Sequence, residues 1–279
     1  MNYKIVVDSC CELPELQKKN PIFQVIPLTL MVDDLQIIDD ETFDQKDFIK
    51  KVAASPNCPK SACPSPESYM KAYEGGFDAV FVVTLSEQLS GSYNSAVLGK
   101  NLFEENNKDT KIHVFNSRSA SVGETQIALR VEELAEAGAS FEEIVEKVEK
   151  FIEEMDTYFV LETLDTLRKN GRLTNLQAII ATVLSIKPIM GATPQGTIFK
   201  IEQARGINKA LARMTEIIAR DVKEPEKKKL MISHCNCPER AEYVKKLLLE
   251  KITVKDVVVL DTAGVATMYA NDGGVIVTI

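Results

Sequence analysis

The sequence has no run of about 18 apolar residues, so we expect no transmembrane helix and no integral membrane association. It also has no long apolar region ahead of its first charged residue, Lys4. A secretory signal peptide needs such a region. We therefore expect a cytoplasmic protein.

A basic surface is missing as well. The formal net charge is -8, and the only basic run, Lys227–Lys229, precedes an apolar strand and is typical of a solvated loop. Nucleic-acid binding requires a positive face. We expect no nucleic-acid partner, and the same acidity disfavours anionic membrane surfaces.

Histidine is scarce, which bears on catalysis. Only His113, inside an apolar strand, and His234 are present, and there is no G-x-S-x-G turn. A serine nucleophile usually needs a histidine base. An aspartate-based phosphatase is disfavoured because Cys10 stands two residues after Asp8. We expect no independent catalysis, although a hydrolase remains the less favoured alternative.

Six cysteines are present, but their spacing is typical of neither zinc ligands nor local disulfides. Reduced thiols are the expectation, with no metal and no cofactor. A redox or metal module remains an alternative, because three cysteines lie in loops that could meet in space: Cys10, Cys11 and Cys63.

The first half alternates strand-like and helix-like segments, which predicts a doubly wound, mostly parallel α/β sheet. A fully apolar run at 79–85 is typical of a strand buried on both faces. Ser65-Pro66-Glu67 is a helix start, with a capping hydroxyl and proline in the first turn. The predicted strands are 5–7, 25–32, 79–85 and 111–115, and the predicted helices are 44–54, one from 65, 90–104, 121–137 and 141–155.

The second half is a mixed α/β lobe, and the boundary is placed near Asp156. The domains are thus 1–156, carrying polar loops, and 157–279. Two strands flank the turn at Pro194-Gln195-Gly196, which is typical of a hairpin. The predicted strands are 187–193, 197–204, 229–234, 256–261 and 274–278, and the predicted helices are 164–170, 175–184, 206–222 and 238–250.

Four polar loops follow strands or open helices in the first half. They contain Asp8-Ser9, Ser61 to Pro66, Ser90-Gly91-Ser92 and Asn116-Ser117. Ligands of open parallel sheets bind beyond the carboxyl ends of the strands. Hydroxyls, a glycine and helix N-termini suit an anion. The loops therefore predict an anion site on one rim, with helix capping as the alternative interpretation.

A series of short motifs runs along the chain in a fixed order. They are Ile5-Val6-Val7-Asp8-Ser9 with Leu13-Pro14, Pro27-Leu28, Ser61-x-x-Pro64-Ser65-Pro66, Ser90-Gly91-Ser92-Tyr93-x-Ser95-Ala96, Gly171-Arg172-Leu173, Ile186-Lys187-Pro188-Ile189 with Gly196, and Arg205-Gly206. Through these motifs the sequence resembles the DegV family over essentially its whole length. Members of that family are bacterial fatty-acid-binding proteins that act as the acyl-presenting subunit of a fatty acid kinase.

The resemblance implies a two-lobed fold that holds one long-chain fatty acid between its lobes. The carboxylate would meet Ser61 and Ser92, or its neighbour Ser90, with the adjoining amides around Gly91. Arg172 matches a family arginine near the mouth, where the kinase would approach. The tail would enter the second lobe, where the candidate lining residues are Leu184, Ile186, Ile189 and Met190.

The sequence departs from the family pattern in three places. Ala62 replaces a hydroxyl residue, Cys10-Cys11 replaces small polar residues, and Tyr269 stands where the family commonly has a histidine. Tyrosine can donate a hydrogen bond but cannot be a cation near neutral pH. Binding could survive while presentation to a kinase fails, and a different lipid or carboxylate ligand remains an alternative.

Overall fold

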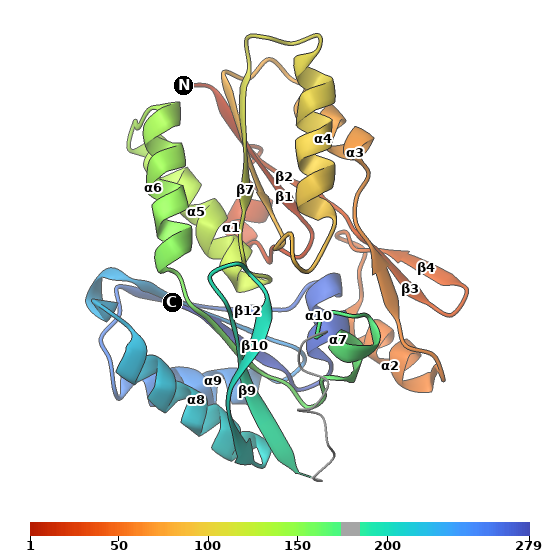
Figure 1. The fold of residues 1–279 in the computed structure, drawn as a ribbon, viewed down its shortest axis with the longest axis vertical. Coiled ribbons are helices and arrows are strands. Elements are labelled where there is room, and N and C mark those ends of the chain that lie inside the picture. Colours follow the sequence, from red (N-terminus) through yellow and green to blue (C-terminus); the bar gives the residue numbers. More distant parts are fainter. Residues whose placement is uncertain (174–184) are drawn as a thin grey trace.

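The computed structural model describes residues 1–173 and 185–279 as two lobes, with the N-terminal lobe uppermost in Figure 1. The predicted α/β class is confirmed. The helix predicted at 175–184 and the predicted tail contact Leu184 lie outside the described residues.

The sheet of the first lobe is entirely parallel, in the order β2-β1-β6-β7. All six residues of β6 are buried, as expected for a strand covered on both faces. Alternate residues of β1 and β6 pack against α5 and α6 on one face and against α3 and α4 on the other. The bounds are β1 (Tyr3–Asp8), β2 (Phe23–Ile26), β6 (Ala79–Thr84), β7 (Lys111–Asn116), α3 (Pro66–Ala72), α4 (Ser92–Glu104), α5 (Val122–Glu136) and α6 (Phe141–Glu154), with the short α1 (Glu15–Lys18) after β1.

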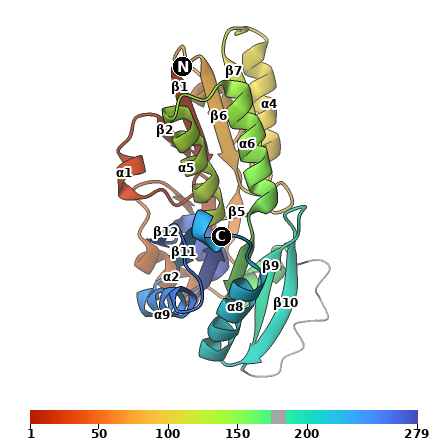
Figure 2. The same ribbon diagram turned by 90° about the vertical axis from the view of Figure 1, so that its left-hand side faces the viewer.

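The second lobe is built on a six-stranded mixed sheet in the order β10-β9-β8-β13-β11-β12. Among the neighbouring strand pairs that the structure describes in this sheet, β11 and β12 are parallel and the others are antiparallel. Helices α8 and α9 cover one face (Figure 2). The bounds are β8 (Thr157–Val160), β9 (Ile186–Ala192), β10 (Ile198–Arg205), β11 (Lys229–His234), β12 (Asp256–Asp261), β13 (Val275–Thr278), α7 (Asp165–Lys169), α8 (Ile207–Asp221), α9 (Pro238–Leu249), α10 (Gly264–Ala270) and a 3-10 turn at Pro225–Lys227.

Helix α5 joins the two lobes, because it packs on both sheets. One side of it contributes Ile127 and Val131 to the first-lobe core, and another contributes Val122 and Leu129 to a cluster with Met231 of β11. Eleven of its fifteen residues are buried. A helix buried all round in this way fixes the relative position of the elements that flank it.

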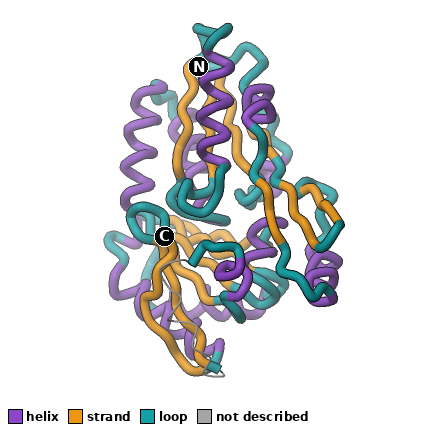
Figure 3. Tube along the Cα trace, turned by 45° about the vertical axis from the view of Figure 1, so that its right-hand side comes forward, coloured by secondary structure: helices purple, strands orange, loops and turns teal. Residues whose placement is uncertain are grey.

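The strand predicted at 25–32 is wrong as one element. The chain turns at Pro27-Leu28, so β2 ends in the parallel sheet and β3 (Thr29–Val32) begins a separate antiparallel sheet, β4-β3-β5. Proline has no N–H for a continuing ladder. The partners β4 (Leu35–Ile38) and β5 (Lys60–Ala62) were not predicted, and α2 (Gln45–Ala54) follows β4 (Figure 3).

The predicted helix start at Ser65 is confirmed. Its hydroxyl accepts a hydrogen bond from the Ser68 amide at 3.3 Å, and Pro66 is the first helical residue. Within the described residues, no helix combines the length and apolar character needed to cross a bilayer.

Helices α3 and α4 touch at Gly99, which allows a close backbone approach. A Cβ atom there would lie 2.6 Å from the Pro66 carbonyl oxygen and 3.0 Å from the Tyr69 Cβ. We expect Gly99→Ala to lower the free energy of unfolding by about 1–3 kcal/mol through overpacking. Denaturant titration of the wild type and the variant measures this change in the free energy of unfolding. The exposed Leu98→Ala on the same helix is the control, and equal effects of both changes would contradict the prediction.

Candidate functional site

A cavity lies between the lobes. The space among its lining side chains is about 840 Å³ with the open mouth included. Most of the lining is apolar. The apolar lining residues are Cys10, Leu28, Leu85, Leu89, Ala120, Phe159, Leu161, Leu167, Ala192, Ile198, Val265, Ala266, Ala270 and Ile276.

Both lobes build this cavity. In the first lobe, the loops after β1, β6 and β7 each contribute lining residues, as does Ser61 of β5. In the second lobe, β8, the β9–β10 hairpin and α10 supply the other walls. The hairpin tip touches the first lobe directly, where the Ser86 hydroxyl donates to the Gly196 carbonyl oxygen at 2.8 Å.

Arg118, Ser119, Ser121 and Thr157 are polar residues of the lining. A second polar group in the lining consists of Ser61, Ser90, Arg172 and Tyr269. The Ser61 and Tyr269 hydroxyls are 3.3 Å apart. The Arg172 guanidinium lies over the Tyr269 ring, 5.7 Å from its centroid, and donates through Nε to the Leu89 carbonyl oxygen at 3.0 Å. This group, which we call the head-group cluster, combines hydroxyl donors with a cation.

Different elements hold each member of the head-group cluster. Ser61 lies on β5, a strand and not the loop expected from the sequence, and Leu30 of β3 pairs with it. Ser90 precedes α4, where its hydroxyl accepts from the Ser92 amide at 3.2 Å. Arg172 follows α7, and Tyr269 lies near the end of α10. The four residues thus come from four segments that are distant in sequence and line the same cavity.

Asp8 and Ser9, two predicted site residues, do not line the cavity. Asp8 is fully buried and accepts from the Leu85 amide at 2.9 Å and the Cys10 amide at 3.0 Å. The Ser9 hydroxyl donates to Asp39 at 2.9 Å and accepts from the Leu28 amide at 3.0 Å. Their polar atoms are occupied in holding the loops that surround the cavity.

Ser92 and Gly91 lie behind the lining residue Ser90. The Ser92 side chain is buried, with its hydroxyl 3.0 Å from that of Ser90. Gly91 packs so closely on Cys63 that a Cβ atom would lie 2.9 Å from its sulfur. Neither residue lines the cavity, whereas Ser90 does.

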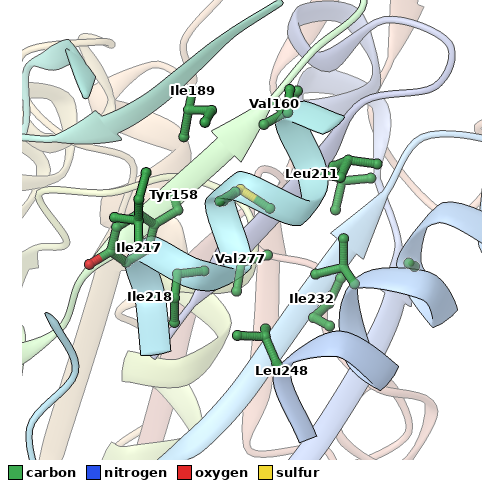
Figure 4. Packing of buried hydrophobic residues seen from close by; sticks show 14 of the residues in the cluster. Tyr158, Val160, Ile189, Leu211, Ile217, Ile218, Ile232, Leu248 and Val277 are labelled. Carbon is green, nitrogen blue, oxygen red and sulfur yellow. The ribbon is translucent and has the colours of Figure 1, made fainter. Parts of the chain in front are cut away.

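Ile189 lies on the other face of the second sheet, in the core beneath α8 (Figure 4). Successive side chains of a strand point to opposite faces. Ile189 therefore packs with Leu211 and Val160, while its neighbour Met190 joins Phe159 and Leu161 on the cavity side. The predicted role of Ile189 in lining the tail is not supported by this placement.

Sequence reasoning missed most of the second-lobe lining. Phe159 and Leu161 come from β8 and the residue after it, and Val265 and Ala266 come from α10. The sequence does carry a signal for β8, because Thr157 to Val160 is a short β-branched and aromatic run. It carries none for α10, whose start has no capping side chain of its own.

Four buried acids lie near the cavity, and burial raises the pKa of each. Desolvation raises the pKa of Glu12 to about 8 and that of Asp39 to about 6. Burial also raises the pKa of Asp8, and the pKa of Glu124 is raised well above its ordinary range by burial and by the charge of Asp8 beside it. This region therefore carries less negative charge than its composition suggests.

Cys10, which lines the cavity, and its neighbour Cys11 are buried. Burial raises the pKa of the Cys10 and Cys11 thiols well above the ordinary value, which disfavours the reactive thiolate. In the described ranges, no three His, Cys, Asp or Glu side chains are arranged to hold a metal ion. His113 pairs with Glu149 at 2.9 Å, and His234 lies 3.3 Å from Asp261, so both have other partners.

The fold and the cavity define a class of two-lobed α/β proteins with a mostly apolar interlobe cavity that also carries polar side chains. A sequence model described as "Uncharacterised protein, DegV family" matches residues 2–279. The chain belongs to the DegV family. A DegV domain-containing protein of Streptococcus pneumoniae is 34% identical, over 99% of this chain and 98% of the relative.

Solved structures agree with this assignment. A DegV family protein of Ruminococcus gnavus, refined with vaccenic acid, is 54% identical with a TM-score of 0.97, covering 100% of this chain and 99% of the other. The fatty acid kinase B3 protein of Streptococcus pneumoniae, loaded with linoleic acid, is 32% identical with a TM-score of 0.90 and the same coverage. A Eubacterium eligens relative loaded with heptadecanoic acid is 28% identical with a TM-score of 0.91, covering 99% and 98%.

The buried Glu12 makes stability depend on pH. Its pKa is about 8 in the folded protein against an ordinary 4.5, so the folded state retains a proton that the unfolded state has lost. The free energy of unfolding should therefore fall as pH rises from 6.5 to 8, by up to ~1.4 kcal/mol per pH unit. Glu12→Gln removes this part of the slope.

Urea titrations of both proteins at pH 6.5, 7.0, 7.5 and 8.0 measure the difference. The exposed Glu15→Gln serves as control and should leave the slope unchanged. Parallel curves for the wild type and Glu12→Gln across this range would contradict the prediction.

Proposed function

We propose that this protein binds one long-chain fatty acid in the interlobe cavity, with the acyl tail among the apolar side chains and the carboxylate at the head-group cluster. The observation that carries the proposal is the lining itself. It is apolar over most of its extent, and at the head-group cluster hydroxyl and guanidinium donors lie together. Three similar structures are named with fatty acids, which supports the same ligand class.

The lining of the cavity favours an acyl chain. Most of its walls are Leu, Ile, Phe, Val and Ala side chains. Burying roughly fifteen methylenes at ~0.8 kcal/mol each supplies ~12 kcal/mol before ordering costs. Association and immobilisation cost at least several kcal/mol. The balance corresponds to micromolar or tighter binding even when the carboxylate contacts only offset its desolvation.

The head-group cluster suits a carboxylate because its members can all donate hydrogen bonds. The hydroxyls of Ser61 and Tyr269 are close enough to approach one carboxylate oxygen together. Arg172 adds a positive charge beside them. Charge-assisted hydrogen bonds of this kind are stronger than neutral ones. An alcohol or ester of the same chain would lose that advantage.

The finer part of the proposal is that the protein presents the carboxylate to a separate kinase. In that reaction a carboxylate oxygen attacks the γ-phosphorus of ATP, ADP leaves, and an acyl phosphate forms. Support comes from the printed name of the pneumococcal relative, a fatty acid kinase B3 protein. Support also comes from Arg172, a member of the head-group cluster that is partly exposed to solvent.

The binding proposal predicts a co-purifying ligand. Mass spectrometry of organic extracts should give about one C16–C18 fatty acid per chain, and delipidated protein should bind added palmitate. Ala192→Phe places a ring in the cavity lining and should weaken palmitate binding at least 10-fold. Leu98→Phe adds the same ring at an exposed site and is the control.

Two outcomes would overturn this binding proposal. One is an empty extract together with no uptake of palmitate or oleate. The other is a different co-purifying lipid, such as an isoprenoid, which would assign the cavity to the alternative ligand. Thermal melts of both variants establish that each is folded before binding is compared.

The presentation proposal predicts acyl phosphate formation when the loaded protein is mixed with ATP and a purified bacterial fatty acid kinase catalytic subunit. Tyr269→Phe keeps the ring and removes the hydroxyl donor, so the rate should fall about 10-fold while palmitate remains bound. Tyr269→His restores a donor and should recover the rate. If loaded wild-type protein gives no acyl phosphate, the presentation proposal is wrong. The binding proposal would then stand for a carrier that is not coupled to a kinase.

A further inference from the structure

Helix α10 is a short element with a large share in the cavity. It supplies Val265, Ala266, Tyr269 and Ala270 to the lining, although it is only seven residues long. A helix of two turns is not stable by itself. Its own N-cap residue, Ala263, offers no side-chain hydrogen bond to the first turn. Something else must hold its start in place.

The first lobe supplies that support through Asp39. One carboxylate oxygen accepts from the Gly264 amide at 2.7 Å, and the other accepts from the Val265 amide at 2.8 Å. Asp39 is 3% exposed and 225 residues from Gly264 along the chain. These contacts are the usual work of an N-cap residue, carried out here by a side chain from the other lobe.

Asp39 is itself held rigidly. The Ser9 hydroxyl donates to it at 2.9 Å and in turn accepts from the Leu28 amide at 3.0 Å. Nearby, the Glu12 carboxyl group accepts from the backbone amide of Ala263 at 3.2 Å. The side-chain amide of Gln45 donates to the Thr262 carbonyl oxygen at 3.0 Å. Every residue from 262 to 265 therefore contacts a side chain of the first lobe.

Gly264 makes the approach of the two lobes possible. A Cβ atom at this position would lie 2.4 Å from Asp39 Oδ1 and 2.8 Å from Leu30 Cδ1. Both neighbours are buried, so neither could easily move aside. The Asp39 carboxylate thus contacts backbone that carries no side chain. The helix cannot shift along its axis without losing both hydrogen bonds from its backbone amides to Asp39.

Tyr269 lies at the other end of this short, rigid helix. Its hydroxyl is 3.3 Å from that of Ser61, at the limit of a useful hydrogen bond. A displacement of the helix start by even 1 Å would carry Tyr269 away from Ser61 and from beneath Arg172. The position of Tyr269 in the head-group cluster therefore depends on the contacts between Asp39 and the start of α10.

We propose that Asp39 is a positioning residue that, by capping α10 from the opposite lobe, holds Tyr269 on Ser61 and sets the preference of the cavity for a carboxylate over an uncharged head group. This inference rests on the proposed fatty-acid function. It assigns to a residue outside the cavity a role in head-group recognition. The ionised carboxylate suits this role, since it accepts from three donors at once.

The test compares affinity for palmitate with affinity for hexadecanol, which has the same chain length and no charge. The ratio of the two dissociation constants measures head-group preference and cancels the shared tail. We expect Asp39→Asn to reduce the preference for palmitate about 10-fold, because an amide cannot accept at both positions. Gly264→Ala should act in the same direction while leaving the carboxylate intact. The exposed neighbour Glu41→Gln is the control.

A double-mutant cycle with Tyr269→Phe then identifies the path of the effect. If Asp39 acts by placing the Tyr269 hydroxyl, Asp39→Asn should cause little further loss of preference once that hydroxyl is gone. A general loss of packing would instead weaken palmitate and hexadecanol equally and leave the ratio unchanged.

The outcomes separate this inference from the function on which it rests. Failure of the wild type to bind palmitate would overturn the proposed function. Wild-type binding with a preference that Tyr269→Phe lowers, but that neither Asp39→Asn nor Gly264→Ala changes, would overturn the positioning role alone. Additive effects of Asp39→Asn and Tyr269→Phe on the ratio would also overturn it.

Discussion

The burial of α5 between two sheets is the constraint on which the rest of the structure depends. Its apolar residues complete the core of the first lobe and also cover part of the second sheet. Gln126 adds direct bonds across the boundary, donating to the carbonyl oxygens of Lys229 and Thr278. The interior of a protein is too closely packed for such a helix to shift gradually. The cavity therefore forms beside a fixed junction of the two lobes.

Next to the apolar contacts of α5, the two lobes are also joined by buried polar contacts. Asp39 and Glu12 meet the backbone at the start of α10, and Ser121, which precedes α5, donates to Glu12 at 2.6 Å. Buried acids are costly unless they are hydrogen-bonded or neutral. Here Glu12 is held largely neutral near pH 7, while Asp39 accepts from two amides and a hydroxyl. The same contacts order the loops that enclose the apolar space.

Much of the fold could be predicted from the sequence, since strands 229–234 and 256–261 and the hairpin around Pro194-Gln195-Gly196 carry strong local patterns. Ser61, Ser90, Arg172 and Tyr269 were found through motif resemblance and do line the cavity. From the sequence, Asp8 and Ser9 could not be told apart from ligand-binding residues. The same residue types serve in buried hydrogen bonds that hold loops and in contacts with a ligand. Helix α10 could not be found, because its cap lies 225 residues away.

The walls of the cavity come from both lobes, and this has a consequence for how the protein melts. A molecule lodged there touches the loops after β1, β6 and β7 as well as β8, β9 and α10. If the lobes separated, the ligand would lose its contacts with one of them. Ligand binding therefore adds to the free energy needed to separate the lobes. An occupied protein should thus unfold as one cooperative unit at a temperature that follows ligand concentration. Without a ligand, the lobes are held together by the protein's own contacts, among them the packing of α5, the Asp39 bonds and the Ser86–Gly196 bond.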